Sequence, residues 1–322
     1  MSEIRFEELA ARLRRAGVVD IRPLAGGVSS LNFSGSIAER RVVIKVAPPG
    51  ILPTLNRDVL RQSQIIRALG STSVPVPEVL WEDAGAPPDI PPLFVMSFVD
   101  GSSFEPLYDL KGDDAGRDVM AQRQLNAART LADLHRLDHG SLGLGDVPAA
   151  APQDEINRWS QALQTIDPGL IAGWEEVREM LMASAPAPCP PSLVHGDFRL
   201  GNLLAVGSRI TAVVDWEIWS VTDPRVDLGW FLLNGDPETY RRETRYAGSM
   251  PALSKLVAAY GDSFGAHPVD LSRFQALAAF KSVATWSLIV KRNRRRVAPD
   301  PDIEMLTHVL PRLLALARTL LD

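Results

Sequence analysis

The most constraining stretch of the sequence is residues 193–204, which reads LVHGDFRLGNLL. It places the side-chain amide of Asn202 five residues after the carboxylate of Asp197. A second carboxylate, Asp215, follows at the end of an apolar run. The turn residues 206–208 separate two apolar segments, and this pattern predicts a small hairpin that returns Asp215 to Asn202.

These side chains are of the kind that phosphoryl transfer from ATP requires. One carboxylate orients the attacking hydroxyl and accepts its proton, and two oxygen ligands hold Mg²⁺ against the phosphates. In the protein-kinase catalytic loop an asparagine ligand follows the base by five positions, and a metal-binding aspartate comes soon after. Asp197, Asn202 and Asp215 reproduce this order. The alternative is a strand-turn-strand segment with an incidental His-Gly-Asp turn, because Gly and Asp are common turn residues.

The His-Gly-Asp triplet at 195–197, Asn202 and the Asp-Trp-Glu triplet at 215–217 together resemble the aminoglycoside phosphotransferase family of small-molecule kinases. The resemblance implies a bilobal, protein-kinase-like α/β (α+β) fold. An N-terminal β-sheet lobe, residues 1–96, is expected to bind the nucleotide. A mainly helical C-terminal lobe, residues 97–322, is expected to carry the catalytic loop and the acceptor site. ATP and Mg²⁺ are expected in the cleft between the two lobes.

The resemblance also implies a role for each polar residue of the motif. Asp197 is the expected catalytic base, with His195 beside it, and Asn202 and Asp215 are the expected Mg²⁺ ligands. Asp227 lies in an apolar segment near the start of a predicted helix. In the family an aspartate at this place braces the catalytic loop, and His195 is its expected partner. A simple carboxylate at a helix start is the alternative for Asp227.

Two features nearer the N-terminus suit a phosphate-binding site. Lys45 lies in the apolar run RVVIKV, and a lysine there is costly to bury unless it meets an anion such as the ATP phosphates. An exposed lysine on an edge strand is the alternative. Upstream, Gly26, Gly27 and Ser29 form a turn between apolar flanks that are expected to pair as strands. Backbone N–H groups in such a turn can approach phosphate oxygens, although most Gly-Gly turns are only turns.

A predicted helix at residues 56–69 places a polar residue, Gln62, on its inward stripe. Family members usually have a glutamate here that pairs with the strand lysine, so Gln62 offers Lys45 only a neutral hydrogen bond. The next buried strand ends in a turn and resembles the hinge between lobes, where backbone groups around Ser97 to Val99 would hydrogen-bond adenine. The full inward stripe is Leu55, Val59, Gln62, Ile66 and Leu69.

The remainder of the sequence is predominantly helical. Helical periodicity predicts helices at about 125–137, 155–163, 173–183, 271–292 and 303–321. The last of these is expected to kink at Pro311.

Composition limits the class of protein. The 322 residues are 46% hydrophobic, enough for a sizeable core, and no apolar run approaches the roughly eighteen residues of a membrane span. The N-terminus has no signal-peptide pattern, so a cytoplasmic location is expected. A net charge of −5 gives no electrostatic case for nucleic acid or membrane partners. The single cysteine, Cys189, has no partner for a disulfide and no metal-ligand spacing.

The sequence therefore predicts an ATP-dependent phosphotransferase that acts on a hydroxyl group of a small molecule. A protein kinase is disfavoured, because no Ala-Pro-Glu segment or activation loop follows Asp215. A non-catalytic nucleotide- or ligand-binding module on the same fold is the alternative, and Gln62 in place of the expected acid is its best support. Members of the family act on aminoglycosides, macrolides, choline, homoserine and sugars, so the resemblance leaves the acceptor open.

Overall fold

The computed structural model describes residues 6–24, 30–109, 115–241 and 243–322. The chain divides into two compact units. Unit 1 comprises residues 1–103 and 201–219, and unit 2 comprises residues 104–200 and 220–322. None of the helices in the described ranges combines the length and hydropathy needed to cross a bilayer.

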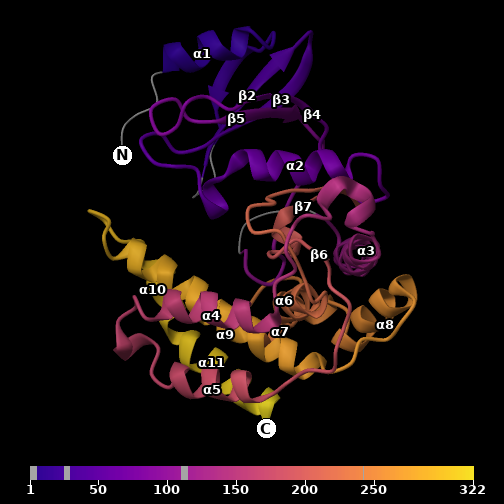
Figure 1. Cartoon of the computed structure of the whole chain (residues 1–322). Coiled ribbons are helices and arrows are strands. Elements are labelled where there is room, and N and C mark those ends of the chain that lie inside the picture. Colours follow the sequence, from indigo (N-terminus) through magenta and orange to yellow (C-terminus); the bar gives the residue numbers. More distant parts are fainter. Residues whose placement is uncertain (1–5, 25–29, 110–114, 242) are drawn as a thin grey trace. The chain divides into compact units, whose positions relative to one another are not determined.

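Unit 1 is built on a five-stranded antiparallel sheet with strand order β1-β2-β3-β5-β4. Helix α1 packs on one face of this sheet, and helix α2 lies along the other (Figure 1). The strands are β1 (Val19–Pro23), β2 (Leu31–Ile37), β3 (Arg40–Val46), β4 (Val79–Asp83) and β5 (Leu93–Ser97), and the helices are α1 (Phe6–Arg14) and α2 (Val59–Leu69). The pairing of β1 with β2 confirms the expectation that the flanks of the glycine turn are paired strands.

Strand β3 lies in the interior of the sheet, hydrogen-bonded to β2 on one side and to β5 on the other. Its alternate residues Val42, Ile44 and Val46 are buried in the core that α1 covers. Lys45 therefore projects to the opposite face, and its side chain is only 9% exposed. The alternative of an exposed lysine on an edge strand is wrong.

Helix α2 begins at Val59, three residues later than predicted, because Asp58 caps it. The Asp58 carboxylate accepts hydrogen bonds from the N–H groups of Leu60 and Arg61. Before the helix, residues Leu55–Arg57 form a short 3-10 turn, and Leu55 is 81% exposed. Leu55 is therefore not part of the buried stripe, whereas the other four predicted members are buried.

The hairpin of β7 (Leu203–Val206) and β8 (Arg209–Val213) belongs to unit 1 although it lies a hundred residues further along the chain. Ser102 and Ala205 exchange two backbone hydrogen bonds of 3.0 Å, and the N–H of Val213 donates to the carbonyl of Pro75 at 2.8 Å. These bonds explain why the compact units differ from the predicted division at residue 96.

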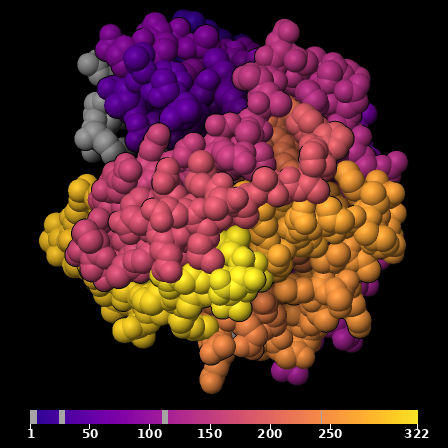
Figure 2. All heavy atoms as spheres, turned by 60° about the horizontal axis from the view of Figure 1, so that its bottom comes forward, coloured from indigo at the N-terminus to yellow at the C-terminus, as the bar shows by residue number. Residues whose placement is uncertain are grey.

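Unit 2 is mainly helical and has a small two-stranded sheet. The long helix α9 is buried along most of its length and packs against α4, α5, α6 and α11 in one apolar core. Figure 2 shows the C-terminal helix between the pink segment that contains α4 and α5 and the orange segment of residues after 240. The helices are α3 (Arg117–His135), α4 (Pro152–Leu163), α5 (Trp174–Ala183), α6 (Arg225–Gly235), α7 (Pro237–Tyr240), α8 (Leu253–Phe264), α9 (Leu271–Asn293), α10 (Pro301–Glu304) and α11 (Leu310–Leu321).

The predicted helix at 303–321 is three shorter segments. Helix α10 is followed by a 3-10 turn at Met305–His308 and then by α11. Pro311 lies in the first turn of α11, where its missing N–H needs no partner. Proline thus starts a helix here, and the expected kink within one continuous helix is wrong.

Candidate active site

The loop that carries His195, Gly196 and Asp197 follows directly on the short strand β6 (Ser192–Val194), which pairs with β9 (Ser220–Thr222). Gly196 has φ +86°, a left-handed conformation that favours glycine. The buried carboxylate of Asp227 accepts the N–H of His195 at 2.6 Å and the N–H of Gly196 at 2.8 Å. Asp227 lies in the first turn of α6, and its carboxylate binds backbone N–H groups of the loop. It is therefore both a carboxylate at a helix start and a residue that braces the loop.

His195 is a partner of Asp227, as expected, through its backbone N–H. The imidazole Nδ1 of His195 accepts a hydrogen bond from the backbone N–H of Asp197 at 3.1 Å. A second histidine, His135 at the end of α3, places its Nε2 3.5 Å from Asp227 Oδ2. The Nδ1 of His135 contacts the Tyr260 hydroxyl at 2.8 Å. His135 is therefore a buried core histidine.

Burial and charge act against each other on Asp227. Complete burial raises the pKa of its carboxyl group, but the hydrogen bond from His135 and the nearby positive groups lower the pKa by more, so that it lies below the ordinary aspartate value. Asp227 is consequently ionised at neutral pH, and the two loop N–H groups are bound to an anion. Charge-assisted hydrogen bonds of this kind are stronger than neutral ones.

Asp197 is held by two side chains that the sequence analysis missed. The indole Nε1–H of Trp230 donates to Asp197 Oδ1 at 2.8 Å, and Arg199 Nε lies 3.4 Å from the same oxygen. Arg199 also pairs with Glu105 at 3.5 Å. Burial alone would lower the pKa of Arg199, but Asp197 and Glu105 raise it, so the guanidinium stays charged. The Asp197 side chain remains 26% exposed.

The sequence contains one indication that Trp230 lies on the same side of its helix as Asp227. Trp230 lies three residues after Asp227 in the same helix, and residues at this spacing share a face. Arg199 lies two residues after Asp197 in the loop, but its pairing with Glu105 depends on a segment ninety residues away and has no local signature.

In unit 1 the hairpin brings the second half of the motif together, as predicted. The N–H of Val214 donates to the carbonyl of Asn202 at 3.0 Å, which places Asp215 beside Asn202. Asp215 has φ +68°, a conformation that non-glycine residues seldom adopt and that is often found at functional sites.

Lys45 meets two carboxylates within unit 1. Its Nζ lies 2.9 Å from Asp215 Oδ1 and 3.3 Å from Glu217 Oε1. Gln62 is buried but donates to the backbone carbonyl of Asn56, and among the described contacts the predicted hydrogen bond from Lys45 to Gln62 is absent. Asp215 and Glu217 supply the negative charge that a neutral Gln62 cannot supply from helix α2.

The donor set around Asn202 fits a magnesium ion that arrives with a nucleotide. Asn202 is buried, whereas the Asp215 carboxylate is 43% exposed. Within the described ranges no group of three His, Cys, Asp or Glu side chains is arranged to hold a metal ion. One carboxylate and one amide oxygen suit Mg²⁺, which commonly completes its coordination shell with phosphate oxygens and water.

Only some of the residues predicted to contact adenine and phosphate lie within the described ranges. The N–H of Ser97 donates to the carbonyl of Glu78 at 2.8 Å, and the Ser97 hydroxyl accepts the N–H of Glu78 at 2.9 Å. Both Ser97 groups are therefore engaged within unit 1, and half-buried Val99 follows two residues later. Gly26, Gly27 and Ser29 lie outside the described residues.

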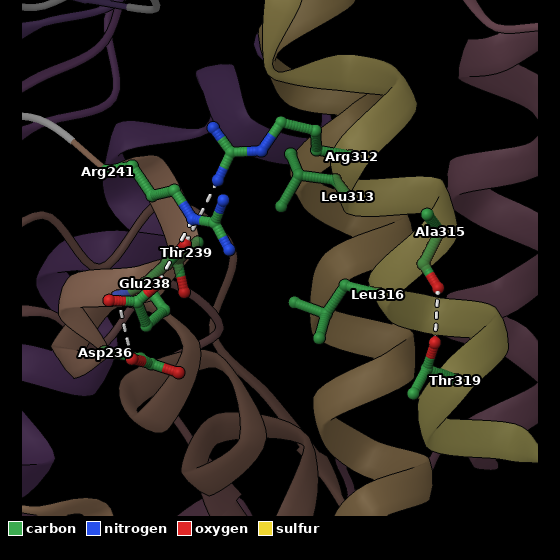
Figure 3. A pocket seen from close by; sticks show the side chains of 9 residues that line it. All are labelled: Asp236, Glu238, Thr239, Arg241, Arg312, Leu313, Ala315, Leu316 and Thr319. Atoms are coloured by element: carbon green, nitrogen blue, oxygen red, sulfur yellow. Dashed lines mark hydrogen bonds and ion pairs between the residues drawn. The ribbon is translucent and has the colours of Figure 1, made fainter.

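Unit 2 also has a surface hollow of about 410 Å³ between α7 and α11. Arg241 and Arg312 both bind Glu238 at its rim, and Leu313 and Leu316 form its apolar side (Figure 3). None of the residues predicted for the active site lines this hollow.

Comparison with known proteins identifies the family. The model of the phosphotransferase enzyme family, which includes the aminoglycoside phosphotransferases, matches residues 20–271. The chain belongs to this phosphotransferase family. This confirms the resemblance inferred from residues 195–217.

Solved structures confirm the kinase-like α/β fold. A Ralstonia eutropha protein described as a candidate aminoglycoside phosphotransferase superposes with a TM-score of 0.76 at 20% identity, covering 98% of this chain and 97% of its own. A thermostable aminoglycoside phosphotransferase in complex with ADP and hygromycin B gives 0.65 at 17% identity, with 96% and 97% covered. A macrolide 2'-phosphotransferase type I gives 0.62 at 14% identity, with 98% and 97% covered.

The curated relatives are longer proteins. Mouse acyl-CoA dehydrogenase family member 10 is 25% identical over 292 residues, which is 86% of this chain and 27% of the relative. Human acyl-CoA dehydrogenase family member 11 is 25% identical over 279 residues, 83% of this chain and 35% of the relative. The chain thus spans about a third of these relatives or less.

Proposed function

We propose that this chain is an ATP-dependent kinase that transfers the γ-phosphoryl group to a hydroxyl of a small molecule. The observation that carries the proposal is the loop at 195–197, in which Asp227 fixes two backbone N–H groups and Trp230 orients a partly exposed Asp197. A carboxylate held in this way is suited to orient a hydroxyl and to accept its proton.

In this reaction Asp197 accepts the acceptor's proton. The acceptor oxygen forms a bond to the γ-phosphorus, the bond from that phosphorus to the bridging oxygen of the β-phosphate breaks, and ADP leaves with that electron pair. Arg199 Nε lies 3.4 Å from Asp197 Oδ1 and, together with the Trp230 indole, holds the carboxylate in place.

Unit 1 supplies the nucleotide-binding groups of the proposal. Lys45 binds the α- and β-phosphates, and Asn202 and Asp215 hold Mg²⁺, which neutralises charge on the phosphates when it is bound. The Lys45 contacts with Asp215 and Glu217 support this assignment, since they hold a cation beside a metal-ligating carboxylate. The N–H of Val99 is the proposed hinge donor to adenine, because the N–H of Ser97 is already engaged.

The remaining predicted contacts are retained as parts of the proposal. Gly26, Gly27 and Ser29 are retained as proposed phosphate contacts, and Gln62, a buried residue of α2, is retained as a proposed residue of the nucleotide site. The imidazole of His195 supports Asp197 by accepting a hydrogen bond from its backbone N–H.

The names of the relatives and structural neighbours suggest which classes of acceptor to test. One structural neighbour binds hygromycin B and another is named for macrolides, so this fold accommodates unlike acceptors. The longer relatives are named acyl-CoA dehydrogenase family members, which favours hydroxylated acyl compounds as acceptors. The acceptor panel therefore combines aminoglycosides, amino alcohols, sugars, hydroxy acids and hydroxyacyl thioesters.

The test is release of ADP from Mg·ATP across this panel, with Asp197→Asn as the key variant. General-base positions typically contribute about 10²–10⁴-fold, and we expect a loss of kcat in this range. Nucleotide binding, measured by calorimetry, should change by no more than about twofold. Asp146→Asn, which alters an exposed carboxylate of unit 2, is the matched control and should keep full turnover. Retained turnover in Asp197→Asn would overturn the assignment.

A non-catalytic binding module is the second candidate. It is favoured by Gln62, which donates to a backbone carbonyl and gives Lys45 no acidic partner from α2. Tight Mg·ATP binding by the native chain without turnover on any acceptor of the panel, or on water, would support this candidate.

A further inference from the structure

Lys281 is a buried lysine in the middle of α9. It lies ten residues beyond residue 271, where the match to the family model ends. The residue is only 5% exposed, and a buried ammonium group is costly unless other groups replace its water. Its described partners are the carbonyl oxygen of Gly196, to which Nζ donates, and the indoles of Trp230 and Trp159, whose ring centroids lie 4.0 Å and 5.7 Å from Nζ.

The contact with Gly196 completes a clamp on the loop. The carbonyl of Gly196 belongs to the peptide group that joins Gly196 to Asp197. Asp227 on α6 already holds the N–H groups of His195 and Gly196. A buried anion thus binds the donors of the loop and a buried cation binds its acceptor, which fixes the peptide groups on both sides of Gly196.

The contact with Trp230 also connects Lys281 to the side chain of Asp197. The ammonium lies over the indole, and the Nε1–H of the same indole donates to Asp197 Oδ1 at 2.8 Å. A cation over an aromatic face draws electron density from the ring and makes its N–H a stronger donor. Lys281 therefore acts on both the backbone and the side chain of Asp197.

We propose that Lys281 is a positioning residue for Asp197, acting on the backbone through Gly196 and on the carboxylate through Trp230. This inference rests on the proposed function, because Asp197 is the proposed base. Burial lowers the pKa of Lys281 below the ordinary lysine value, and Arg158 on α4 lowers it further, whereas Asp197, Glu155 and Asp227 raise it.

The first test measures the loop directly and needs no substrate. Hydrogen–deuterium exchange is followed at the amides of His195 and Gly196 in the native chain, in Lys281→Met and in Lys291→Met. Lys291 is the matched control, since it lies on the same helix and its Nζ donates to the carbonyl of Thr165. We expect exchange about tenfold or more faster in Lys281→Met and unchanged in Lys291→Met.

The indole N–H of Trp230 provides a second readout that needs no activity. Its resonance in a ¹⁵N-tryptophan-labelled protein should move in Lys281→Met, which removes the cation over the indole, and in Asp197→Asn, which removes the negative charge of the oxygen that accepts the indole N–H. Native-like loop exchange together with a native-like Trp230 resonance in a folded Lys281→Met protein would overturn the proposal.

The kinetic test uses an acceptor found with the panel. We expect Lys281→Met to lower kcat by about 10–100-fold, because small displacements of a reacting group cost rate on this scale, while the KM for ATP changes by no more than about twofold. Lys281→Arg keeps the charge and a donor and should lose less than Lys281→Met. Trp230→Phe keeps a ring but loses the N–H, and it should lower kcat without affecting ATP binding.

The outcomes separate this inference from the proposed function. A loosened loop with an unchanged kcat would overturn the positioning role. If Lys281→Met does not fold, Lys281→Arg is tested by loop exchange, the Trp230 resonance and kcat, and Trp230→Phe is tested by loop exchange and kcat. If the native chain transfers no phosphate, the proposed function fails, and the exchange and indole measurements still decide whether Lys281 holds the loop.

Discussion

Lys45 is held in this chain by two carboxylates, and this arrangement makes a specific prediction about nucleotide binding. In the proposed nucleotide site, replacing Lys45 with Met removes a charge-assisted hydrogen bond to phosphate, which is typically worth about 1.5–3 kcal/mol. We therefore expect Mg·ATP to bind about 10–100-fold more weakly, as measured by calorimetry. Arg40→Met is the control, since Arg40 lies on the same strand with an exposed side chain. Equal affinities in the two variants would exclude Lys45 from the phosphate site.

Asp227 links the loop to the pH dependence of stability. Its pKa is lowered in the folded protein, so it stabilises the fold at pH values above the unfolded aspartate pKa of about 3.9. That contribution decreases as the pH falls through this value and is lost below the folded pKa. Asp227→Asn should cost about 3–5 kcal/mol at pH 7, because it breaks a buried charged network.

Denaturant unfolding of the native chain and Asp227→Asn between pH 7 and pH 3 measures this effect. The difference in unfolding free energy should be largest above about pH 5 and should shrink on acidification. Asp133→Asn is a suitable control, because burial raises the pKa of Asp133, and its contribution to stability changes with pH in the opposite sense. If the difference in unfolding free energy between the native chain and Asp227→Asn does not depend on pH, the charge of Asp227 does not support the loop.

The residues that the sequence identified are those whose chemistry is local to a motif. Asp197, Asn202 and Asp215 have a readable spacing, and Lys45 is conspicuous in an apolar strand. Lys281 lies among apolar neighbours at helical spacing, Leu277, Ala278 and Ala284, so the sequence could indicate that it is buried. The sequence could not indicate its contact with the loop at 195–197, because tertiary packing decides where α9 meets that loop.

At the scale of elements, the crossing of α6 and α9 depends on Gly229. A Cβ atom added at Gly229 would lie 2.4 Å from the carbonyl oxygen of Phe274, a backbone atom that cannot rotate away. Gly229→Ala should therefore lower the unfolding free energy by about 1–3 kcal/mol, the usual cost of overpacking. It should also lower kcat, because α6 carries Asp227 and Trp230.

The matched control is Gly248→Ala. A Cβ atom at Gly248 meets nothing within 4 Å, so this change should leave the melting temperature unaltered. Thermal unfolding of the two variants tests the prediction, and equal melting temperatures would show that the two helices can separate without cost.

Most helices and strands were predictable from the spacing of apolar residues and from turn residues. The errors at the starts of α2 and α11 have a common cause. Leu55 has the spacing of the α2 stripe, but the cap at Asp58 starts the helix after it. Pro311 falls within a helical pattern, yet it begins α11 because the 3-10 turn before it ends another segment. In both cases local backbone hydrogen bonding decided the boundary, and the hydrophobic pattern alone did not contain that information.

At the scale of the whole molecule, unit 1 is discontinuous in sequence. Residues 201–219 contribute the β7–β8 hairpin, the backbone bonds to Ser102 and Pro75, and the two carboxylates that meet Lys45. The sequence predicted the hairpin and its return of Asp215 to Asn202. It could not predict the assignment of the hairpin to unit 1, because the pairing partners lie about a hundred residues away.

This discontinuity predicts that residues 1–103 do not form a stable unit alone. The fragment loses three inter-segment backbone hydrogen bonds, each worth about 1 kcal/mol, and leaves Lys45 buried without its anions at a cost of about 3–5 kcal/mol. That sum is comparable to the whole stability of a small domain. Joining residues 201–219 to the fragment through a flexible Gly/Ser linker should restore a cooperative thermal transition, followed by circular dichroism.

The same fusion with Asp215→Asn and Glu217→Gln separates the two contributions. It keeps the hairpin and its backbone bonds but removes both charges, so it should unfold cooperatively at a lower melting temperature than the unaltered fusion. If the fragment alone melts at the temperature of the fusion, the hairpin is only an attachment to unit 1. The carboxylates of Asp215 and Glu217 would then serve the nucleotide site without holding the fold that presents Lys45.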